Sequence, residues 1–277
     1  MSVVDLSEAE FTRFQTYIYD VSGIRVGNHK RTLVSNRLRR RVRATGCEDF
    51  SDYYKLLTSV KGRQEMTDFL NEITTNETFF LRDQHQYDWF LEEFLVGISR
   101  AAREGKRPKR LKIWSAASST GEEPYSMALC LARHPGSWSG WTIGITATDL
   151  SEAALAKGRE GIYSDRAVHL IDETHRRLYF KHDAANNLWH IKPNVKNYVT
   201  FRHHNLLNAP TGGPFDCIFI KNVLIYFDTE SKQRVVDHLL RALAPGGYLV
   251  VGPSEGIFRM LDALEKEKTW LYRKPTT

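Results

Sequence analysis

The strongest constraint on the fold is an alternation of apolar runs and helical patterns that begins after residue 110. The run LKIWSA precedes a helical pattern at about 122–133, and WTIGITATD precedes a helix with Ser151 as its expected N-cap. FDCIFI is continuously apolar, as is typical of a strand buried on both faces, and a helix at about 229–243 and the strand YLVVG follow it. This order predicts an α/β fold, a doubly wound parallel sheet covered by helices on both faces.

The first eighty residues show only helical spacing of apolar side chains. Ser7 and Glu10 form a capping-box pattern at the start of one helix, and Gly23 is its expected stop. Three further helices are predicted at about 30–44, 49–58 and 62–73. We therefore predict a helical domain at 1–80 and an α/β domain at 81–277.

Residues at about 160–200 interrupt the alternation of strands and helices. LWHIKP and NYVTFR look like short strands around the turn signal AANN, which predicts a small β subdomain inserted into the α/β domain. The charged run REGKRPKR at 103–110 is expected to be an exposed loop before the first strand of the sheet.

Composition narrows the class of protein. The chain of 277 residues has 39 Lys and Arg against 33 Asp and Glu, so its net charge is +6, a mild excess that can hide a concentrated patch. Three widely spaced cysteines without a CxxC pair, and histidines without HExxH spacing, predict no bound metal. No apolar stretch approaches the roughly 18 residues of a membrane span. The acidic first residues do not resemble a secretory signal, so we expect a cytoplasmic protein with no membrane insertion.

Ligands of doubly wound folds bind outside the carboxyl ends of the strands, where this chain places polar side chains. The turn after LKIW has one glycine and matches no dinucleotide or triphosphate motif. Glu122 and Glu123 at the following helix start would repel phosphate and suit a ligand with positive charge, although ordinary helix capping explains them equally well.

Two further positions lie at strand ends. Asp149 ends the second strand, where an acid can hold both hydroxyls of a ribose; as an N-cap of the next helix it would be two residues early, so we favour the ribose. Lys221 and Asn222 stand between two apolar runs directly after the buried strand. A solvated turn is the alternative, which the apolar VLIYF that follows disfavours.

The segment that joins the two predicted domains contains Asn76, Thr78 and Arg82, which could face one side of an interdomain cleft. Simple packing by its two phenylalanines is the alternative.

The run from His29 to Arg43 holds seven Lys or Arg and no acid. On a helix, Val34, Leu38 and Val42 form an apolar seam, while a stripe outside it contains Leu33, Asn36, Arg40 and Arg43. Because no acid is available at helical spacing, we expect uncompensated repulsion and favour a partner surface over a solvated face. The partner is either a phosphate backbone or an acidic protein.

Taken in order, these segments resemble the chemotaxis receptor methyltransferase family, CheR, over nearly the whole chain. ITTNETFFLRD resembles the family's N-x-T-x-F-F-R segment, and WSAASSTGEEPYSMAL its cofactor turn. ATDLSEAALAKGREGIY, HNLL, FDCIFIKNVLIYFD and LAPGGYLVVGPSE follow in the family's order.

The resemblance implies a helical N-terminal domain and a class I methyltransferase domain, Rossmann-like, with a small β subdomain. It implies S-adenosylmethionine (S-adenosyl-L-methionine) as methyl donor, with S-adenosyl-L-homocysteine as product. The expected acceptors are glutamate carboxylates on chemoreceptor cytoplasmic helices, which become methyl esters in chemotactic adaptation. The β subdomain of some members docks a tethering peptide at a receptor C-terminus.

The resemblance also assigns residues. Arg82 and Tyr226 fall near the methyl transfer, and the basic helix is expected to meet the receptor through Arg37, Arg40, Arg41 and Arg43. The family's cofactor-contacting positions correspond to Asn76, Thr78, Arg82, Glu123, Asp149, Asn205, Leu206, Lys221 and Asn222. Two residues depart from the family pattern: Lys221 replaces a usual Arg, which turns a bidentate contact into a point charge, and Leu81 replaces a usual Phe.

The chemistry is consistent with these residues. A glutamate with an unperturbed pKa of about 4.3 is already an anion at neutral pH, so displacement at a sulfonium methyl needs no general base. The main rival is a nucleic-acid methyltransferase, against which stand the absence of an NPPY-type motif and of an aromatic-rich basic groove. The second rival is a non-catalytic docking protein, against which the intact acidic and asparagine positions argue.

Overall fold

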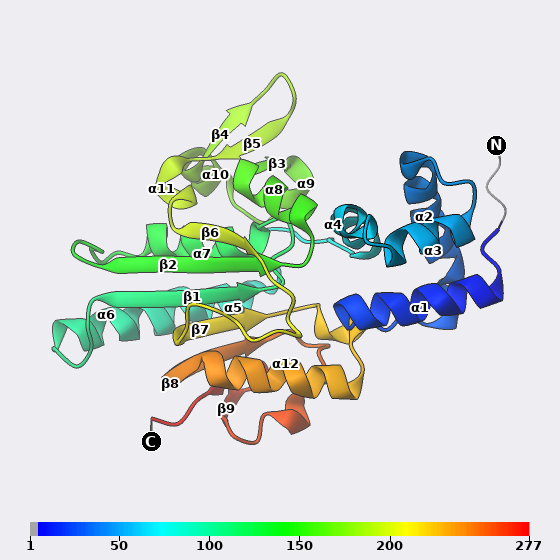
Figure 1. The fold of residues 1–277 in the computed structure, drawn as a ribbon. Helices are drawn as coiled ribbons and strands as arrows, with labels where there is room; N and C mark the ends of the chain where they lie inside the picture. The colour runs from blue at the N-terminus through cyan, green and yellow to red at the C-terminus, as the bar shows by residue number, and fades with distance from the viewer. Residues whose placement is uncertain (1–4, 277) are drawn as a thin grey trace.

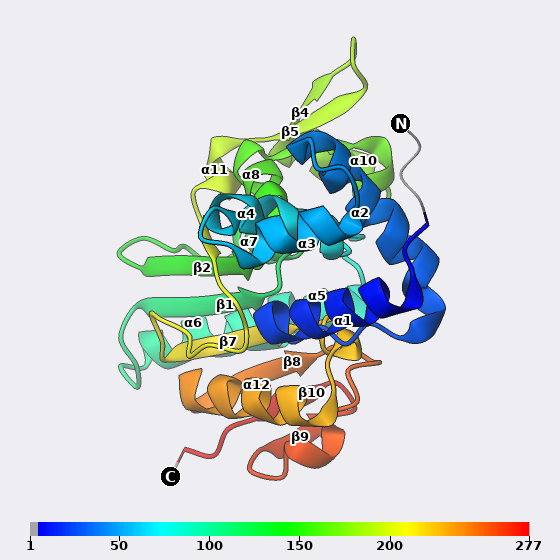
Figure 2. The ribbon, with the colours of Figure 1, turned by 45° about the vertical axis from the view of Figure 1, so that its right-hand side comes forward.

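The computed structural model describes residues 5–276, which form a helical domain placed against the carboxyl edge of an α/β sheet (Figure 1). Residues 1–4, part of the segment used to argue against a secretory signal, lie outside the described residues. Figure 2 shows the same arrangement from a second side, with α1 (Glu8–Ser22) crossing in front of the sheet.

The helical domain contains the four helices expected from the sequence. They are α1 (Glu8–Ser22), α2 (Arg31–Thr45), α3 (Phe50–Thr58) and α4 (Gly62–Ile73), with a short 3-10 turn, η1 (Asn28–Lys30), before α2. Ser7 and Glu10 form the predicted capping box, and Gly23 and Gly46 end α1 and α2 in the left-handed conformation. Phe14, Leu38 and Phe69 are fully buried in the core between the helices.

The α/β domain is built on a seven-stranded sheet with the order β6-β2-β1-β7-β8-β10-β9. Its first five strands run parallel, as predicted, while β10 pairs antiparallel with β8 and with β9. The strands are β1 (Arg110–Ala116), β2 (Thr142–Asp149), β6 (Val199–His203), β7 (Phe215–Ile220), β8 (Leu243–Val251), β9 (Glu265–Lys268) and β10 (Leu271–Arg273).

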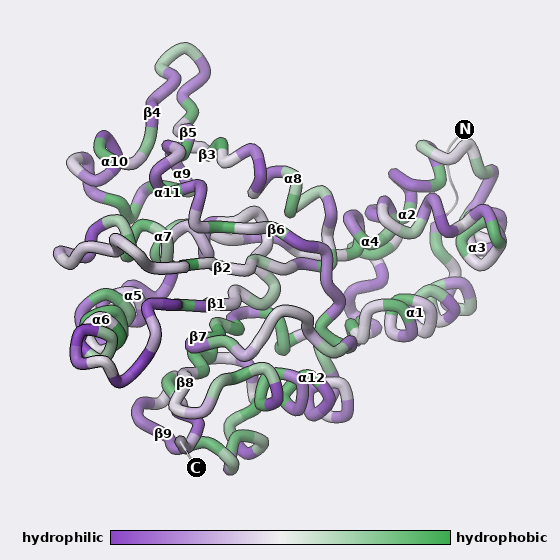
Figure 3. The backbone as a smooth tube through the Cα atoms, turned by 60° about the vertical axis from the view of Figure 1, so that its left-hand side comes forward, coloured by the Kyte–Doolittle hydropathy of each residue, from purple (hydrophilic) through white to green (hydrophobic). Residues whose placement is uncertain are grey.

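Helices cover both faces of this sheet. One face packs against the segment 84–103 and α7 (Glu122–Arg133), and the other packs against α12 (Thr229–Ala242). α8 (Glu152–Glu160) follows β2, and two short 3-10 turns, η3 (Leu224–Tyr226) and η4 (Phe258–Met260), follow β7 and β8. The loop REGKRPKR between α6 (Val96–Arg103) and β1 is largely exposed, as predicted, and strongly hydrophilic (Figure 3).

The sequence did not predict the helical segment before β1. It comprises α5 (Gln84–Trp89), a π-helix η2 (Phe90–Leu95) and α6 (Val96–Arg103). Hydrogen bonds in a π-helix join residues five apart, so its buried side chains do not follow the spacing of 3.6 residues that reveals an α-helix.

The predicted β subdomain exists, but one of its expected strands belongs elsewhere. β3 (Ile162–Ser164), β4 (Phe180–Asp183) and β5 (Leu188–Ile191) form an antiparallel sheet in the order β3-β5-β4, and AANN is the turn between β4 and β5. Three short helices accompany this sheet, α9 (Asp165–Val168), α10 (Glu173–Tyr179) and α11 (Pro193–Lys196).

NYVTFR was wrongly placed in that subdomain. It forms β6, which pairs in parallel with β2 at the edge of the main sheet, with Val199 opposite Ile145. A strand pattern predicts a strand but not its partner, because the partner is chosen by packing between segments that are distant in sequence.

Candidate functional site

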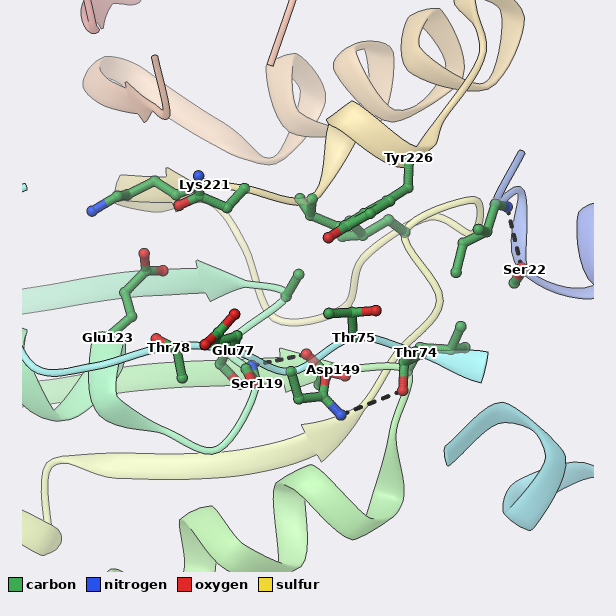
Figure 4. Close-up of a pocket in the computed structure, with 18 of the residues that line it drawn as sticks. Ser22, Thr74, Thr75, Glu77, Thr78, Ser119, Glu123, Asp149, Lys221 and Tyr226 are labelled. Carbon is green, nitrogen blue, oxygen red and sulfur yellow. Dashed lines mark hydrogen bonds between the residues drawn. The ribbon is translucent and has the colours of Figure 1, made fainter. Parts of the chain in front are cut away.

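One pocket opens where the carboxyl ends of β1, β2, β6 and β7 meet the helical domain (Figure 4). It encloses about 1050 Å³, part of which is open to solvent. It is lined by every position predicted to contact the cofactor or the transferred methyl group: Asn76, Thr78, Arg82, Glu123, Asp149, Asn205, Leu206, Lys221, Asn222 and Tyr226. Residues more than 140 positions apart in the sequence therefore converge on one cavity, at the edge of the sheet where such folds bind ligands.

The turn after β1 forms one wall. Ala117 and Ser119 have positive φ angles of 63° and 48°, and Gly121 has φ 97°. A Cβ on Gly121 would lie 2.9 Å from the Phe201 ring, so the tight turn needs glycine there. The hydroxyl oxygens of Ser118 and Ser119 are buried without a hydrogen-bond partner among the described residues. Buried polar atoms of this kind in a pocket wall are suited to a polar ligand.

Asp149 lies at the end of β2 with only 7% of its surface exposed. One carboxylate oxygen accepts from the Ser119 backbone N–H at 2.8 Å, and the other accepts from the Ser151 N–H at 2.8 Å. Burial raises the pKa of Asp149, and these backbone hydrogen bonds oppose the rise. Each oxygen still has a free lone pair, so the carboxylate can accept two further hydrogen bonds from a ligand.

The alternative role of Asp149, as N-cap of α8, is filled by another residue. Ser151 is the N-cap, as predicted, and its side chain accepts from the Ala154 N–H at 3.2 Å.

The two acids at the start of α7 have different surroundings. Glu122 accepts a hydrogen bond from the Thr120 hydroxyl at 2.7 Å and does not line the pocket. Glu123 lines the pocket and accepts from the Ser115 hydroxyl at 2.7 Å. Burial raises the pKa of Glu123, and the nearby charge of Lys221 counteracts the rise. Of these two acids, Glu123 is therefore the one placed to face a positively charged ligand.

Lys221 supports the wall that contains Arg82. Its side chain is only 2% exposed, and its ammonium donates to the Arg82 carbonyl at 2.7 Å and lies 3.0 Å from the Asp83 carboxylate. Leu81 and Asp83 both have positive φ, 59° and 65°, so the ammonium holds a strained turn. In Figure 4 the Lys221 amine points along the wall rather than into the cavity.

Leu81, the second departure from the family pattern, is 5% exposed and belongs to the core beneath the sheet. Its backbone N–H donates to the Ser126 hydroxyl at 3.0 Å, and its side chain does not line the pocket. The substitution of leucine for phenylalanine therefore changes core packing and leaves the pocket wall as it is.

Arg82 and Tyr226 lie on different walls of the cavity. The Arg82 guanidinium donates to the Glu77 carbonyl at 3.3 Å and lies 5.8 Å from the centre of the Phe79 ring. The Tyr226 ring lies 5.4 Å from the Lys30 ammonium, and its hydroxyl points into the cavity (Figure 4). Both side chains are half-buried, so they have access to the cavity and to solvent.

The helical domain completes the pocket, in line with the interdomain cleft predicted at the joining segment, but the residues that this domain contributes were not predicted. Ser22 and Ile24, from the turn after α1, line the cavity beside Phe227. The Asn205 amide donates to the Val21 carbonyl at 3.0 Å, and the Arg25 N–H donates to the Tyr226 carbonyl at 2.7 Å. No local pattern indicates such contacts; only the stop at Gly23 marks the turn.

The basic helix α2 is compensated by acids, contrary to the prediction from its own sequence. Arg41 makes two hydrogen bonds of 2.8 Å to the Glu65 carboxylate and one of 2.9 Å to Asp68. Arg40 pairs with Glu72 at 2.5 Å. The expectation of uncompensated repulsion was wrong because the acids come from α4, which lies beside α2 in the bundle but far away in sequence.

The faces of α2 are nevertheless those predicted. Val34, Leu38 and Val42 are buried, and the stripe outside them is exposed: Leu33, Asn36, Arg40 and Arg43. Arg37 is half-buried and donates to the Ile73 carbonyl and, at 3.0 Å, to the Thr75 hydroxyl. Arg43 makes no ion pair within residues 5–276. The role of these arginines in partner binding stays a prediction.

Two features of the described residues bear on other kinds of function. Within residues 5–276, no group of His, Cys, Asp and Glu side chains is arranged to hold a metal ion. In the same part of the chain, no helix is long and apolar enough to cross a membrane.

Comparison with known proteins gives a consistent picture. The family model described as "CheR methyltransferase, all-alpha domain" matches residues 9–74, and "CheR methyltransferase, SAM binding domain" matches residues 76–272. The matched regions meet a few residues before the domain boundary at residue 80 that was predicted from the helical pattern. A "Chemotaxis protein methyltransferase" of Vibrio anguillarum is 36% identical over 270 residues, which cover 96% of this chain and 95% of that protein. The protein of the same name from Escherichia coli K12 is 37% identical over 258 residues, 90% of this chain and 85% of the relative.

Proposed function

The chain belongs to the CheR methyltransferase family, and on this premise we propose that its acceptors are glutamate side chains on the cytoplasmic helices of chemoreceptors. The reaction of the chain is S-adenosylmethionine-dependent methylation of chemoreceptors, with S-adenosylhomocysteine as the product from the donor. The products on the receptor are then glutamate methyl esters. The observation that carries the proposal is the convergence on one pocket of all ten positions predicted to contact the cofactor or the transferred methyl group.

The pocket residues fit S-adenosylmethionine. The Asp149 carboxylate has free lone pairs for the two ribose hydroxyls, and the unpartnered Ser118 and Ser119 hydroxyls offer further hydrogen bonds. The Glu123 carboxylate suits the positive charge of the donor. Leu206 and Ile24 supply apolar wall for the flat base.

S-adenosylmethionine supplies the electrophilic methyl group, and the residues of this chain position the acceptor. We assign the orientation of the acceptor carboxylate to the Arg82 guanidinium, through charge-assisted hydrogen bonds. Tyr226 would form the opposite side of the acceptor channel, because its hydroxyl points into the cavity. An ionised glutamate is already the nucleophile, so rate enhancement would come from in-line placement and exclusion of water.

The receptor is proposed to lie across α2. The helix that carries the exposed stripe borders the pocket, since Lys30 just before α2 lies 5.4 Å from the centre of the Tyr226 ring and Arg37 donates to Ile73 and Thr75 of the pocket wall. The arginines of this stripe complement an acidic helix bundle. A receptor C-terminal tethering peptide would add to an edge strand of the β3-β5-β4 sheet, the usual way in which an extended peptide joins a sheet. A cytoplasmic location accords with acceptors of this kind.

The test is transfer of a labelled methyl group from S-adenosylmethionine to purified chemoreceptor cytoplasmic fragments. We expect label on the receptor that mild alkali releases as volatile methanol, which identifies a carboxyl methyl ester. Matched fragments with glutamine in place of the acceptor glutamates serve as the control and should stay unlabelled. Alkali-stable label, or preferential labelling of nucleic acid, would overturn the proposal.

A further inference from the structure

A buried carboxylate outside the pocket supports one of its walls. Glu255 lies in the turn after β8, is fully buried, and is not among the residues that line the cavity. One of its carboxylate oxygens accepts from the Asn222 backbone N–H, and the other accepts from the N–H groups of Val223 at 3.3 Å and Leu224 at 2.7 Å. Three consecutive backbone amides therefore point at a single side chain.

These amides belong to the loop after β7, which supplies three of the predicted site residues, Lys221, Asn222 and Tyr226. Asn222 is the second residue of the loop and has a positive φ of 59°, so the loop turns sharply there. The Tyr226 N–H donates to the Val223 carbonyl at 3.1 Å, which links Tyr226 directly to the segment that Glu255 holds. Successive amides directed to one side form a concave anion site, and here the anion is a side chain of the chain itself.

The surroundings of Glu255 are shaped for this role. A Cβ on Gly252 would lie 2.5 Å from the Glu255 carboxylate and 3.2 Å from the Asn222 nitrogen, so glycine leaves the space that the carboxylate occupies. The Lys232 ammonium donates to the Glu255 main-chain carbonyl at 2.7 Å, which fixes the backbone of Glu255 and not its side chain. The carboxylate makes no ion pair within residues 5–276. Its burial is compensated mainly by the three amides.

We propose that Glu255 is a positioning residue for methyl transfer, which fixes the loop 222–226 so that the Tyr226 hydroxyl stays directed into the pocket. The inference rests on the proposed function, because it assigns Tyr226 a place beside the transferred methyl group. Glu255 touches neither pocket nor acceptor and acts through the loop alone. The Arg25 N–H holds the Tyr226 carbonyl from the other side at 2.7 Å, so the residue is fixed from both domains.

The test compares Glu255→Gln with Asp216→Asn in the full-length enzyme. Asp216 is the control, because its carboxylate also accepts a neighbouring backbone N–H, that of Lys112 at 2.8 Å, but at the opposite end of β7, where it also pairs with Arg107 at 2.9 Å. The glutamine keeps the shape of Glu255 and turns an amide N–H₂ toward the loop amides, so we expect kcat to fall by about tenfold or more. Asp216→Asn should leave kcat within about twofold of the wild type.

A double-variant cycle with Tyr226→Phe gives the readout that a merely structural role would not produce. If Glu255 acts by placing the Tyr226 hydroxyl, most of the loss in kcat disappears when that hydroxyl is already absent. If Glu255→Gln lowered kcat by the same factor in the wild type and in Tyr226→Phe, the inference would be overturned. A kcat for Glu255→Gln that matches the Asp216→Asn control would overturn it too. Glu255→Asp, whose shorter side chain cannot reach all three amides, replaces the glutamine variant if that variant does not fold.

Hydrogen exchange separates failure of the inference from failure of the proposed function. The amides of residues 222–224 should exchange faster in Glu255→Gln than in the wild type or in Asp216→Asn. Unchanged exchange would overturn the inference whatever the activity. Faster exchange together with no methyl transfer by the wild type would overturn the proposed function and leave the structural support by Glu255 standing.

Discussion

At the scale of single residues, the site depends on carboxylates whose burial is compensated by backbone amides. Asp149 shows the consequence for pH, because burial raises its pKa and the ionised form is the better acceptor for ribose hydroxyls. Its carboxyl group gains a proton at a higher pH than an ordinary aspartate does. Since the ligand favours the ionised form, its affinity should fall as the pH drops through this raised pKa.

Asp149→Asn should therefore bind S-adenosylhomocysteine about tenfold more weakly near neutral pH, for the loss of a charged hydrogen-bond acceptor. Calorimetry across a pH series measures the difference in affinity for S-adenosylhomocysteine between the wild type and Asp149→Asn. The pKa of Glu123 is also raised, and that group titrates in both proteins, so the difference reports on Asp149. A difference that stays constant as the pH falls would contradict the assignment.

Arg82 should affect turnover more than cofactor affinity, because its guanidinium is assigned to the acceptor. Arg82→Ala is expected to lower kcat by about a hundredfold, the scale of a misplaced reacting group, with a smaller change in the dissociation constant for S-adenosylmethionine. Steady-state kinetics with receptor fragments and calorimetry measure the two quantities. Turnover equal to that of the wild type would remove Arg82 from the methyl-transfer step.

At the scale of elements, α2 separates arginines that hold the bundle from arginines that face outward. Arg41 and Glu65 are only 16% and 10% exposed at their side chains, and the Tyr53 hydroxyl also donates to Glu65 at 2.7 Å. Removing Arg41 leaves this carboxylate buried and unpaired, so Arg41→Ala should lower the free energy of unfolding by about 3 kcal/mol. Chemical denaturation measures the loss.

Arg43→Ala is the matched control on the same helix. Arg43 is exposed and makes no ion pair in the described part of the chain, so its removal should change the stability by less than about 0.5 kcal/mol. It should raise the KM for receptor fragments if the stripe meets the receptor. Stability losses of equal size for the two variants would refute the division of roles.

The elements also show where sequence reasoning succeeds. Helices α1 to α4 and strands β1, β2 and β7 were predicted because helix caps, helix stops and the spacing of apolar residues are found within each segment itself. The pairing of β6 with β2 and of Arg41 with Glu65 is decided between distant segments, so no local pattern contains it. The π-helix at Phe90–Leu95 was not predicted for a different reason. The spacing of its buried side chains matches neither the period of an α-helix nor that of a β-strand.

At the scale of the whole molecule, the pocket is shared between the two domains. α1 is held to the α/β domain by the Tyr19 hydroxyl, which donates to Asp228 at 2.8 Å, and by the bond from Asn205 to the Val21 carbonyl. The turn after α1 also pairs with the pocket loop as a bridge between Ile24 and Phe227. Ligand binding should therefore stabilise the contact between the domains as well as the sheet.

The corresponding prediction concerns hydrogen exchange at residues 19–26. Saturation with S-adenosylhomocysteine should slow exchange there, because opening this turn exposes one wall of the pocket and releases the ligand. Helix α3, which does not line the cavity, is the internal control and should change little. Protection restricted to the α/β domain would show that the helical domain takes no part in binding.

Site residues could be predicted from the sequence where they belong to a motif that resembles one of the family. Motif positions such as Asp149 and Asn222 did converge on one pocket. Ser22 and Ile24 line the same pocket but come from a domain whose packing the sequence does not specify. Glu255 acts through backbone amides, which any residue supplies, so its partners left no pattern to recognise.

The most direct test of the account is an experimental structure of the complex with S-adenosylhomocysteine. We expect one ligand per chain, with its ribose on Asp149, its sulfur end between Arg82 and Tyr226, and Ile24 against its surface. Calorimetry with ATP and NAD as controls should show that binding is selective. A ligand seated elsewhere, or one that leaves Asp149 and Tyr226 untouched, would contradict the central claim.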